Sequence, residues 1–167
     1  MAEQTASEAR WPKRTTKGVY ALIIEVGRPQ LVKVGRLGPR EMPSGLHVYV
    51  GSAMGGGSQS LQGRIRRHLS AEKSPRWHID FVLAAPSVAV RSVVFAEASR
   101  RLECQLTGKL RSIPSVRMPV PRLGASDCRE RCGSHLLLFP DLGLEKVERK
   151  AVEAFKALGL SPMTLRP

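Results

Sequence analysis

Residues 47–68 have the sequence HVYVGSAMGGGSQSLQGRIRRH, in which an apolar, a glycine-rich and a basic part follow one another. The β-branched and aromatic residues up to Gly51 predict a short strand, and the run Gly55-Gly56-Gly57 predicts a flexible loop. The part after the loop has an apolar residue at every fourth position, which predicts a helix with one apolar face. A strand, a flexible turn and a cationic helix together form an arrangement suited to holding phosphate groups.

The apolar face of the predicted helix consists of Leu61, Ile65 and Leu69. Its basic residues Arg64, Arg67 and His68 lie off this stripe, and Arg64 and His68 are one turn apart. We therefore expect these side chains to be free to face a ligand. The glycine run lacks the lysine and the serine or threonine of a P-loop, so we interpret it as a connector rather than a nucleotide-binding loop.

The chain carries 27 lysine and arginine residues against 14 aspartate and glutamate residues, which gives a formal net charge of +13. A charge of this size exceeds what solubility requires and predicts a polyanionic partner. Nucleic acid fits this prediction better than a membrane does, because the arginines are distributed through the sequence instead of following one amphipathic helix. The alternative is a basic surface with no such partner.

No apolar run approaches the length of a membrane span, and residues 1–10 lack the apolar segment of a signal peptide. We therefore expect no contact with a membrane and a location inside the cell, in the cytoplasm. The three cysteines are an odd number, which in a reducing compartment argues against a disulfide framework.

A chain of 167 residues is long enough for one domain with a sizeable core. We expect an α+β fold with a small, largely antiparallel central sheet flanked by helices. Strands are predicted at 18–26, 31–34, 46–50, 89–95 and 135–139, with a hairpin between the first two and a loop at 35–45. Helices are predicted at 61–69 and 77–83, from residue 97 onward and from residue 144 onward. Residues 1–16 are predicted to be a flexible tail, 17–140 the domain, and 141–167 a C-terminal helix and tail.

The chain has two tyrosines, and each stands in a short triplet that contains glycine. Tyr20 ends Gly18-Val19-Tyr20 in the first predicted strand, and Tyr49 begins Tyr49-Val50-Gly51 in the third. In an antiparallel sheet the two phenol groups could approach each other. Taken singly, each tyrosine would be interpreted as a packing residue. The pair, with a basic helix following the second triplet, indicates a site.

These two triplets and the basic helix resemble the GIY-YIG nuclease superfamily, with valine in place of isoleucine in each triplet. The resemblance implies a GIY-YIG-like fold and a metal-dependent endonuclease that hydrolyses phosphodiester bonds in DNA. It also implies that Arg64 and His68 are the arginine and the histidine that the family carries on this helix. His78 matches a further histidine found in part of the family, and Glu103 resembles the single carboxylate that binds the metal. The late asparagine of the family has no counterpart, because the chain contains no Asn.

Within the superfamily, four further segments are similar to an archaeal and bacterial subfamily. They are Trp77-His78-Ile79-Asp80, Glu103-Cys104, Ser126-Asp127-Cys128 and Ser134-His135-Leu136. Some members of that subfamily are fused to endonuclease III-type repair glycosylases, which implies a role in DNA repair or processing and a repair protein as partner. The resemblance spans residues 18–139, and the ordered set of motifs is more specific than either triplet alone.

Chemical reasoning assigns the central candidates a task in phosphodiester hydrolysis. Glu103 offers a hard oxygen ligand, which suits one Mg²⁺ or Mn²⁺ ion. Arg64 can place its guanidinium fork on the phosphate oxygens. Tyr20 is the candidate general base if Tyr49 and a metal-bound water lower its pKa, which for a free phenol is near 10.

The other candidates have less specific tasks. His68 or His78 could act as an acid or contact the phosphate. Taken alone, His68 would be interpreted as an exposed helical histidine and His78 as a capping or packing residue. Glu103 flanks the apolar stripe of its helix, so we expect its carboxylate to point toward the sheet. The candidate nucleic-acid contacts are Arg66, Arg67 and Arg76.

A second group of residues has metal-ligating chemistry. Cys128, Cys132 and His135 are close in sequence, and Cys104 lies upstream. Three thiolates and an imidazole would suit tetrahedral zinc. The spacing is not one of the strong zinc patterns, so partly buried free thiols are the favoured interpretation and structural zinc is the less favoured one.

The sequence leaves more than one function open. The first hypothesis is the metal-dependent endonuclease, and the alternative is a non-catalytic nucleic-acid-binding module that uses the same basic cleft. A third hypothesis is a protein-interaction domain with an incidental basic surface. A nuclease requires a metal and the Glu103 carboxylate for cleavage, whereas a binding module requires neither.

Overall fold

The strand β1, Gly18–Val26, forms the centre of the molecule. The computed structural model of the protein describes residues 11–72 and 74–167. Within these residues, β1 pairs antiparallel with β4 (Gly45–Ala53) on one side and with β5 (Val88–Glu97) on the other. The short strands β6 (Leu136–Phe139) and β7 (Met163–Leu165) extend the two sides, so the sheet order is β6-β4-β1-β5-β7. The predicted α+β fold with an antiparallel central sheet is confirmed.

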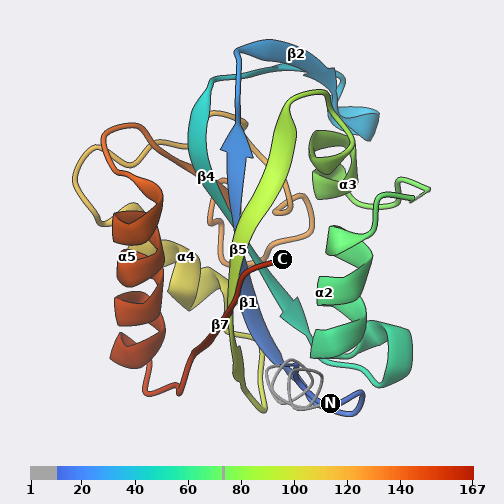
Figure 1. Ribbon diagram of the computed structural model, residues 1–167, viewed down its shortest axis with the longest axis vertical. Coiled ribbons are helices and arrows are strands. Elements are labelled where there is room, and N and C mark those ends of the chain that lie inside the picture. The colour runs from blue at the N-terminus through green and yellow to red at the C-terminus, as the bar shows by residue number, and fades with distance from the viewer. Residues whose placement is uncertain (1–10, 73) are drawn as a thin grey trace, which may run out of the picture.

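Both faces of this sheet are covered by helices (Figure 1). The side chains of β1 alternate between the faces, but nearly all of them are buried. The helices α2 (Leu61–Leu69) and α3 (His78–Leu83) pack on the face that carries Tyr20 and Leu22. The helices α4 (Glu103–Arg111) and α5 (Leu144–Ala157) pack on the other face. A strand buried on both faces shows a continuous apolar run, and this explains the composition of β1.

The predicted hairpin between the first two strands is wrong. The strand β2 (Gln30–Lys33), which matches the predicted strand at 31–34, pairs with β3 (Pro39–Met42) in a separate two-stranded sheet. The strand β3 lies inside the segment 35–45, which was predicted to be a loop. Both sides of β1 are already paired with β4 and β5, so β1 has no free edge for β2. The chain reverses between β2 and β3 at Gly35 and Gly38, whose φ angles of 47° and 73° favour glycine.

Two predicted boundaries also change. The strand β4 continues to Ala53, past the predicted end at residue 50. The helix predicted from residue 97 begins at Glu103, because β5 itself runs to Glu97 and the backbone N–H of Ala98 still bonds Lys17 O beside β1.

The two predicted tails are shorter than expected. Residues 1–10 of the predicted N-terminal tail lie outside the described residues, but residues 11–16 pack against the start of α2. The backbone N–H of Leu61 bonds Thr16 O at 2.9 Å, and the Trp11 ring lies under the Arg66 guanidinium. At the other end, α5 covers the sheet and β7 pairs with β5, so residues 144–165 belong to the domain itself.

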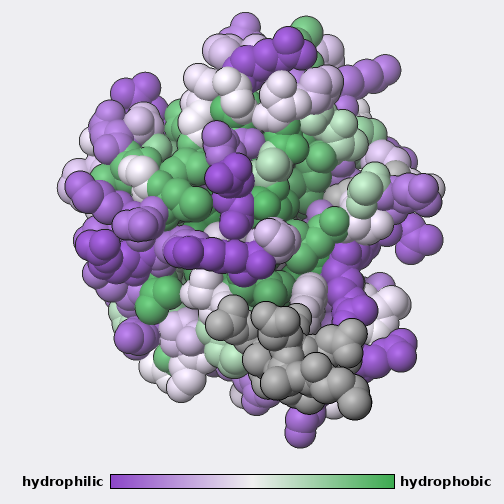
Figure 2. Space-filling model, viewed as in Figure 1, coloured by the Kyte–Doolittle hydropathy of each residue, from purple (hydrophilic) through white to green (hydrophobic). Residues whose placement is uncertain are grey.

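Hydrophilic and apolar residues occupy different parts of the surface. On the face seen in Figure 2, hydrophilic side chains cover the outer sides of α2 and α5, and apolar residues gather between them over the central strands. In the described part of the chain, no helix combines the length and the apolar character needed to cross a membrane.

Candidate functional site

A cleft of about 880 Å³ lies beside the last residues of β4. The strand β6 pairs with β4 only as far as Tyr49, and one further bond joins Val50 N–H to His135 O. Beyond this point the edge of β4 is open, so side chains from both faces of the sheet reach the cleft. The predicted site residues that line it are Tyr20, Tyr49, Arg64, Arg76, His78, Glu103, Cys104, Cys128 and His135.

The two tyrosines lie on neighbouring strands at the floor of the cleft. Tyr20 stands opposite Gly51, and Tyr49 stands opposite Leu22, so the phenols lie two positions apart on one face. A Cβ atom at residue 51 would lie 2.5 Å from the Tyr20 Oη. Glycine at this position therefore makes room for the phenol. The imidazole of His68 lies against both rings, with centroid distances of 5.4 Å to Tyr20 and 6.2 Å to Tyr49.

The environment of the tyrosines keeps both phenols protonated. Burial raises the pKa of Tyr20 to about 12, although the Arg64 guanidinium beside it acts in the opposite direction. Burial and the neighbouring Tyr20 raise the pKa of Tyr49 as well. In the protein without a bound metal ion, desolvation of the phenolate therefore outweighs the nearby positive charge of Arg64.

The guanidinium of Arg64 lies in the cleft wall, and its hydrogen-bond donors are only partly paired. It lies 5.0 Å above the Trp77 ring, and its Nη2 donates to Gln59 Oε1 at 3.1 Å. Its buried Nε has no hydrogen-bond partner in the described part of the chain. A buried guanidinium N–H without an acceptor is costly, and a phosphate oxygen in the cleft would satisfy it.

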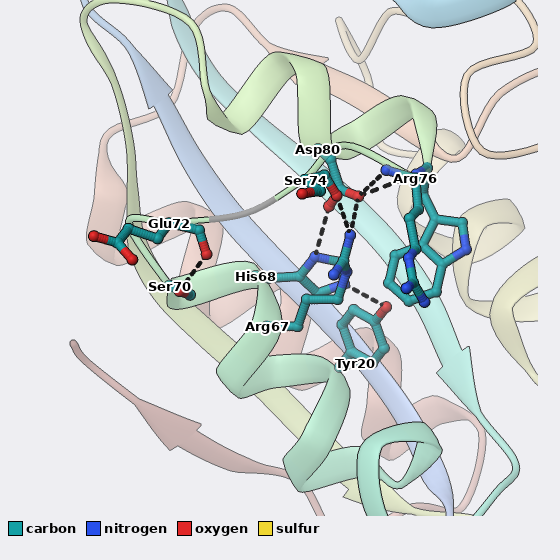
Figure 3. Close-up of polar contacts among 9 residues, drawn as sticks. Tyr20, Arg67, His68, Ser70, Glu72, Ser74, Arg76 and Asp80 are labelled. Atoms are coloured by element: carbon teal, nitrogen blue, oxygen red, sulfur yellow. Dashed lines mark hydrogen bonds and ion pairs between the residues drawn. The ribbon is translucent and has the colours of Figure 1, made fainter.

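His68 and Arg67 are not free to face a ligand, contrary to the expectation from the helical spacing. His68 is 2% exposed, and its Nε2 lies 2.8 Å from the Tyr20 Oη (Figure 3). Arg67 donates to Asp80 Oδ2 at 2.7 Å. Both side chains point toward α3, which packs beside the C-terminal turn of α2, and the helical spacing contains no information about this neighbour.

The three candidate nucleic-acid contacts are separated. Arg76 lines the cleft. Arg67 is bound to Asp80, and the Arg66 guanidinium lies 5.0 Å above the Trp11 ring on an exposed part of α2. Arg76 is therefore the member of the three that can contact a ligand in the cleft.

Asp80 is a buried residue to which the sequence assigned no task. Its carboxylate is inaccessible to solvent and accepts the backbone N–H groups of Arg76 at 2.9 Å and Trp77 at 3.0 Å. Burial alone would raise the pKa of Asp80, but these N–H groups and Arg67 lower it below its ordinary value. A sequence signal existed, because an acidic residue at the third helical position is typical of a helix N-terminus.

Glu103 is the first residue of α4 and reaches the cleft from the opposite side. Its Oε2 accepts a hydrogen bond from Ser52 Oγ, and Arg101 Nη1 lies 3.5 Å from Oε1. Its side chain is 15% exposed, so the carboxylate points toward β4 as expected. Ser52 was missed by the sequence analysis, although it directly follows the second tyrosine triplet.

His78 lies at the start of α3 and lines the cleft. Burial and the nearby Arg122 lower the pKa of His78 below its ordinary value, while Asp127 acts in the opposite direction. The imidazole is therefore neutral at pH 7 and could accept a proton or a hydrogen bond from a ligand.

Three cysteines and a histidine, Cys104, Cys128, Cys132 and His135, lie close together, and we call them the Cys3His group; all but Cys132 line the cleft. Its ligand atoms all lie within 4.8 Å of one another. The Sγ of Cys128 is 3.4 Å from that of Cys104 and 3.5 Å from that of Cys132, and Cys104 Sγ is 3.8 Å from His135 Nε2. This group could hold a metal ion. The sequence favoured free thiols, because it does not reveal that the segment between α4 and β6 folds back onto α4.

The chain matches a known protein family. A family model described as "Domain of unknown function DUF123" matches residues 19–160, which run from β1 into the segment after α5. This range contains the tyrosines, Glu103 and the Cys3His group. No curated protein and no solved structure matches the chain.

Proposed function

The chain belongs to the DUF123 family, and we propose that it is a metal-dependent endonuclease of the GIY-YIG type that hydrolyses phosphodiester bonds in DNA. One observation carries the proposal. A single cleft contains the two tyrosines, the Arg64 guanidinium with its unpartnered buried Nε, and the Glu103 carboxylate. These groups come from four different elements, β1, β4, α2 and α4, so their convergence is a property of the fold rather than of one local motif.

The cleft offers what phosphodiester hydrolysis requires. Arg64 binds the phosphate oxygens, and Arg76 adds a second positive charge along the cleft wall. Glu103 fits a hard divalent ion, because Ser52 orients its carboxylate and part of the side chain remains accessible. Such an ion, Mg²⁺ or Mn²⁺, would neutralise charge that develops on the phosphoryl oxygens.

Tyr20 has the position of a general base but is a phenol at neutral pH. It can accept a proton from an attacking water only if its own phenolic proton leaves at the same time. The His68 Nε2 lies 2.8 Å from the Tyr20 Oη and can accept that proton. Tyr20 therefore acts together with His68, not alone.

The net charge of +13 supports a nucleic-acid substrate, because a basic protein gains affinity from the phosphate backbone. The likeness to proteins fused to repair glycosylases supports DNA repair or processing as the context, with a repair protein as partner.

A non-catalytic nucleic-acid-binding module is the second candidate. The absence of Asn from the chain and the raised pKa values of both tyrosines favour it. Such a module would bind DNA through the same arginines and would not cleave it.

Glu103→Gln separates the two candidates. A panel of duplex, branched and single-stranded DNA is incubated with the protein in Mg²⁺, Mn²⁺ or EDTA. We expect metal-dependent cleavage by the natural protein and a loss of more than about 100-fold in Glu103→Gln, because the glutamine side chain is a poor metal ligand. DNA affinity should change by less than about threefold, because in this proposal Glu103 binds the metal and Arg64 and Arg76 bind the phosphate groups.

The matched control is Glu145→Gln, an exposed carboxylate in the first turn of α5. It should cleave as the natural protein does. Cleavage that survives in Glu103→Gln contradicts the metal-ligand assignment, and DNA binding without cleavage under any metal condition supports the binding module.

For the Cys3His group we propose zinc. Zinc–sulfur bonds of about 2.3 Å in a tetrahedron separate two sulfur ligands by about 3.8 Å, close to the separations of 3.4 and 3.5 Å found here. The His135 ring also hydrogen-bonds the backbone of Gly124, the kind of second contact that orients a metal-binding imidazole. The ion would have a structural role, because it joins α4 to the segment before β6.

Metal analysis of the purified protein tests this site. We expect about one zinc per chain, and we expect Cys128→Ser to lose it and to melt at least about 5 °C lower. Asp127→Asn, which changes the neighbouring residue, should retain the zinc. If Cys128→Ser does not fold, adding a strong chelator to the natural protein measures the same stabilisation. A natural protein that is stable and binds no added zinc would contradict the proposal.

A further inference from the structure

We propose that Asp80 is a positioning residue, which holds His68 in the state whose Nε2 accepts the phenolic proton of Tyr20. The three side chains Asp80, His68 and Tyr20 come from α3, α2 and β1 and follow one another in a line that ends at Tyr20 (Figure 3). The catalytic meaning of this line rests on the proposed function. The arrangement of the three side chains and the tautomer of His68 do not depend on the proposed function.

The two carboxylate oxygens of Asp80 have different surroundings. Oδ2 accepts three donors, which are Arg67 Nη2 at 2.7 Å and the backbone N–H groups of Arg76 and Trp77. Oδ1 has no hydrogen-bond partner among residues 11–72 and 74–167, and it lies 4.0 Å from His68 Nδ1. One oxygen is therefore fixed by the N-terminus of α3, and the other faces the imidazole.

A purely structural role would need only Oδ2. That oxygen alone accepts the N–H groups at the start of α3, and it alone binds Arg67. Leaving Oδ1 buried with no donor costs free energy. The unsatisfied oxygen is explained if its negative charge acts on His68.

The charge of Asp80 determines which nitrogen of His68 carries the proton. A distance of 4.0 Å is longer than a hydrogen bond, so the interaction is electrostatic. A negative charge on the Nδ1 side favours the proton at Nδ1. The lone pair of Nε2 then faces the Tyr20 Oη at 2.8 Å, which makes Tyr20 the hydrogen-bond donor.

Other charged and titratable groups act on Tyr20 and are part of the same environment. Burial raises the pKa of Tyr20, Arg64 on α2 acts in the opposite direction, and Asp80 on α3 and Glu103 on α4 also oppose the phenolate. The phenolate is therefore not a stable resting state. Proton transfer from Tyr20 to His68 is favourable only while Tyr20 gains a proton from another donor.

The resulting step is balanced. An O–H bond of the attacking water breaks, and its proton forms a new O–H bond on Tyr20. The original phenolic O–H bond breaks, and its proton binds Nε2 of His68, whose positive charge Asp80 stabilises. The water oxygen bonds to phosphorus as the bond from phosphorus to the leaving oxygen breaks. The leaving oxygen takes a proton from solvent, and His68 returns its proton to solvent afterwards.

The test compares the natural chain with Asp80→Asn, whose amide oxygen can still accept the N–H groups at the start of α3. Long-range ¹H–¹⁵N NMR correlations report the tautomer of each histidine, and His68→Gln identifies the signals of His68 among those of the four histidines. We expect a proton on Nδ1 in the natural chain. In Asp80→Asn we expect the proton affinity of the His68 ring to fall about tenfold or more.

Two further readouts complete the test. If cleavage is found, the acid limb of the pH–rate profile should move in Asp80→Asn while KM changes little, a shift that a merely structural residue would not cause. If Asp80→Asn does not fold, the tautomer of the natural chain decides alone. A proton on Nε2 overturns the proposal. Because this measurement needs no cleavage, its failure is distinguishable from failure of the nuclease assignment.

Discussion

Arg64 and His68 lie one helical turn apart on α2, yet they have different surroundings. Arg64 lines the cleft, whereas His68 is buried beneath it against Tyr20 and Asp80. The spacing in the sequence predicts that both residues share a face of the helix, and this is correct. The spacing does not predict how deeply each side chain is buried, because burial depends on α3, which packs beside the C-terminal turn of α2.

His47 provides a pH-dependent contribution to stability. It lies on β4 with no exposed surface, and its Nε2 has no partner in the described residues. Burial lowers the pKa of His47 from 6.5 to about 4, although a hydrogen bond to the Gly45 backbone acts in the opposite direction. Below about pH 6.5 the unfolded chain therefore binds a proton that the folded chain does not bind, and folding loses up to about 3 kcal/mol by pH 4.

Urea unfolding of the natural chain and of His47→Gln at pH 7 and pH 4.5 measures this contribution. The natural chain should lose about 2 kcal/mol more on acidification than the variant does. The carboxylates with lowered pKa values, Asp80 and Glu148, destabilise both proteins equally in acid, so the difference isolates His47. Equal losses in the two proteins would mean that His47 is not the responsible group.

At the scale of elements, the pairing of β1 with β4 determines how the cleft floor is built. Gly51→Ala places a Cβ atom 2.5 Å from the Tyr20 Oη, so the phenol has to move away from His68. We expect destabilisation by about 1–3 kcal/mol, because the strand interior has no room to relax. Thermal unfolding measures it, and Tyr20 fluorescence or NMR reports the ring movement.

Gly56→Ala is the control for this substitution. A Cβ atom at residue 56 has no neighbour within 4 Å, and its φ of −102° is open to any residue. Its stability should change by less than about 0.5 kcal/mol. Equal effects of the two substitutions would show that the close approach of Tyr20 to Gly51 does not affect the free energy of unfolding.

The sequence predicted those elements best whose pattern is local. The bounds of β1 and α2 agree with their predictions, because a long apolar run and a stripe at every fourth residue depend only on neighbours in the chain. The partner of β2 could not be predicted in this way. Strand pairing is decided by which edges are free, and that depends on β5, more than fifty residues later.

The same distinction applies to the residues of the candidate site: those in local motifs could be predicted, and those that depend on contacts between elements could not. Tyr20, Tyr49, Arg64 and Glu103 could be proposed from motifs, and they line one cleft. The roles of Asp80 and Ser52 could not, because each acts through a contact between two separate elements. The Cys3His group shows this most clearly, since Cys104 meets Cys128 and His135 only after the intervening segment has folded back.

At the scale of the whole molecule, the positive charge should act through particular arginines. DNA affinity should fall steeply with salt, and each phosphate contact contributes about 0.9 to the slope of log affinity against log salt concentration. Arg76→Gln should therefore reduce this slope by about 0.9, because Arg76 lines the cleft. Arg149→Gln, an exposed arginine on α5, is the control and should leave the slope unchanged. Equal slopes for Arg76→Gln and the natural protein would place the DNA elsewhere.

The central position of β1 also has a consequence during synthesis on the ribosome. The central strand of the sheet is made first, but its two partners, β4 and β5, follow later in the chain. Because the ribosome adds roughly 5–20 residues per second, one edge of β1 remains unpaired for several seconds until β5 has been synthesised. An apolar segment of this kind, rich in β-branched residues, is prone to pair with other chains. The nascent chain therefore passes through a period in which the strand that later holds Tyr20 has unpaired edges that another chain could join.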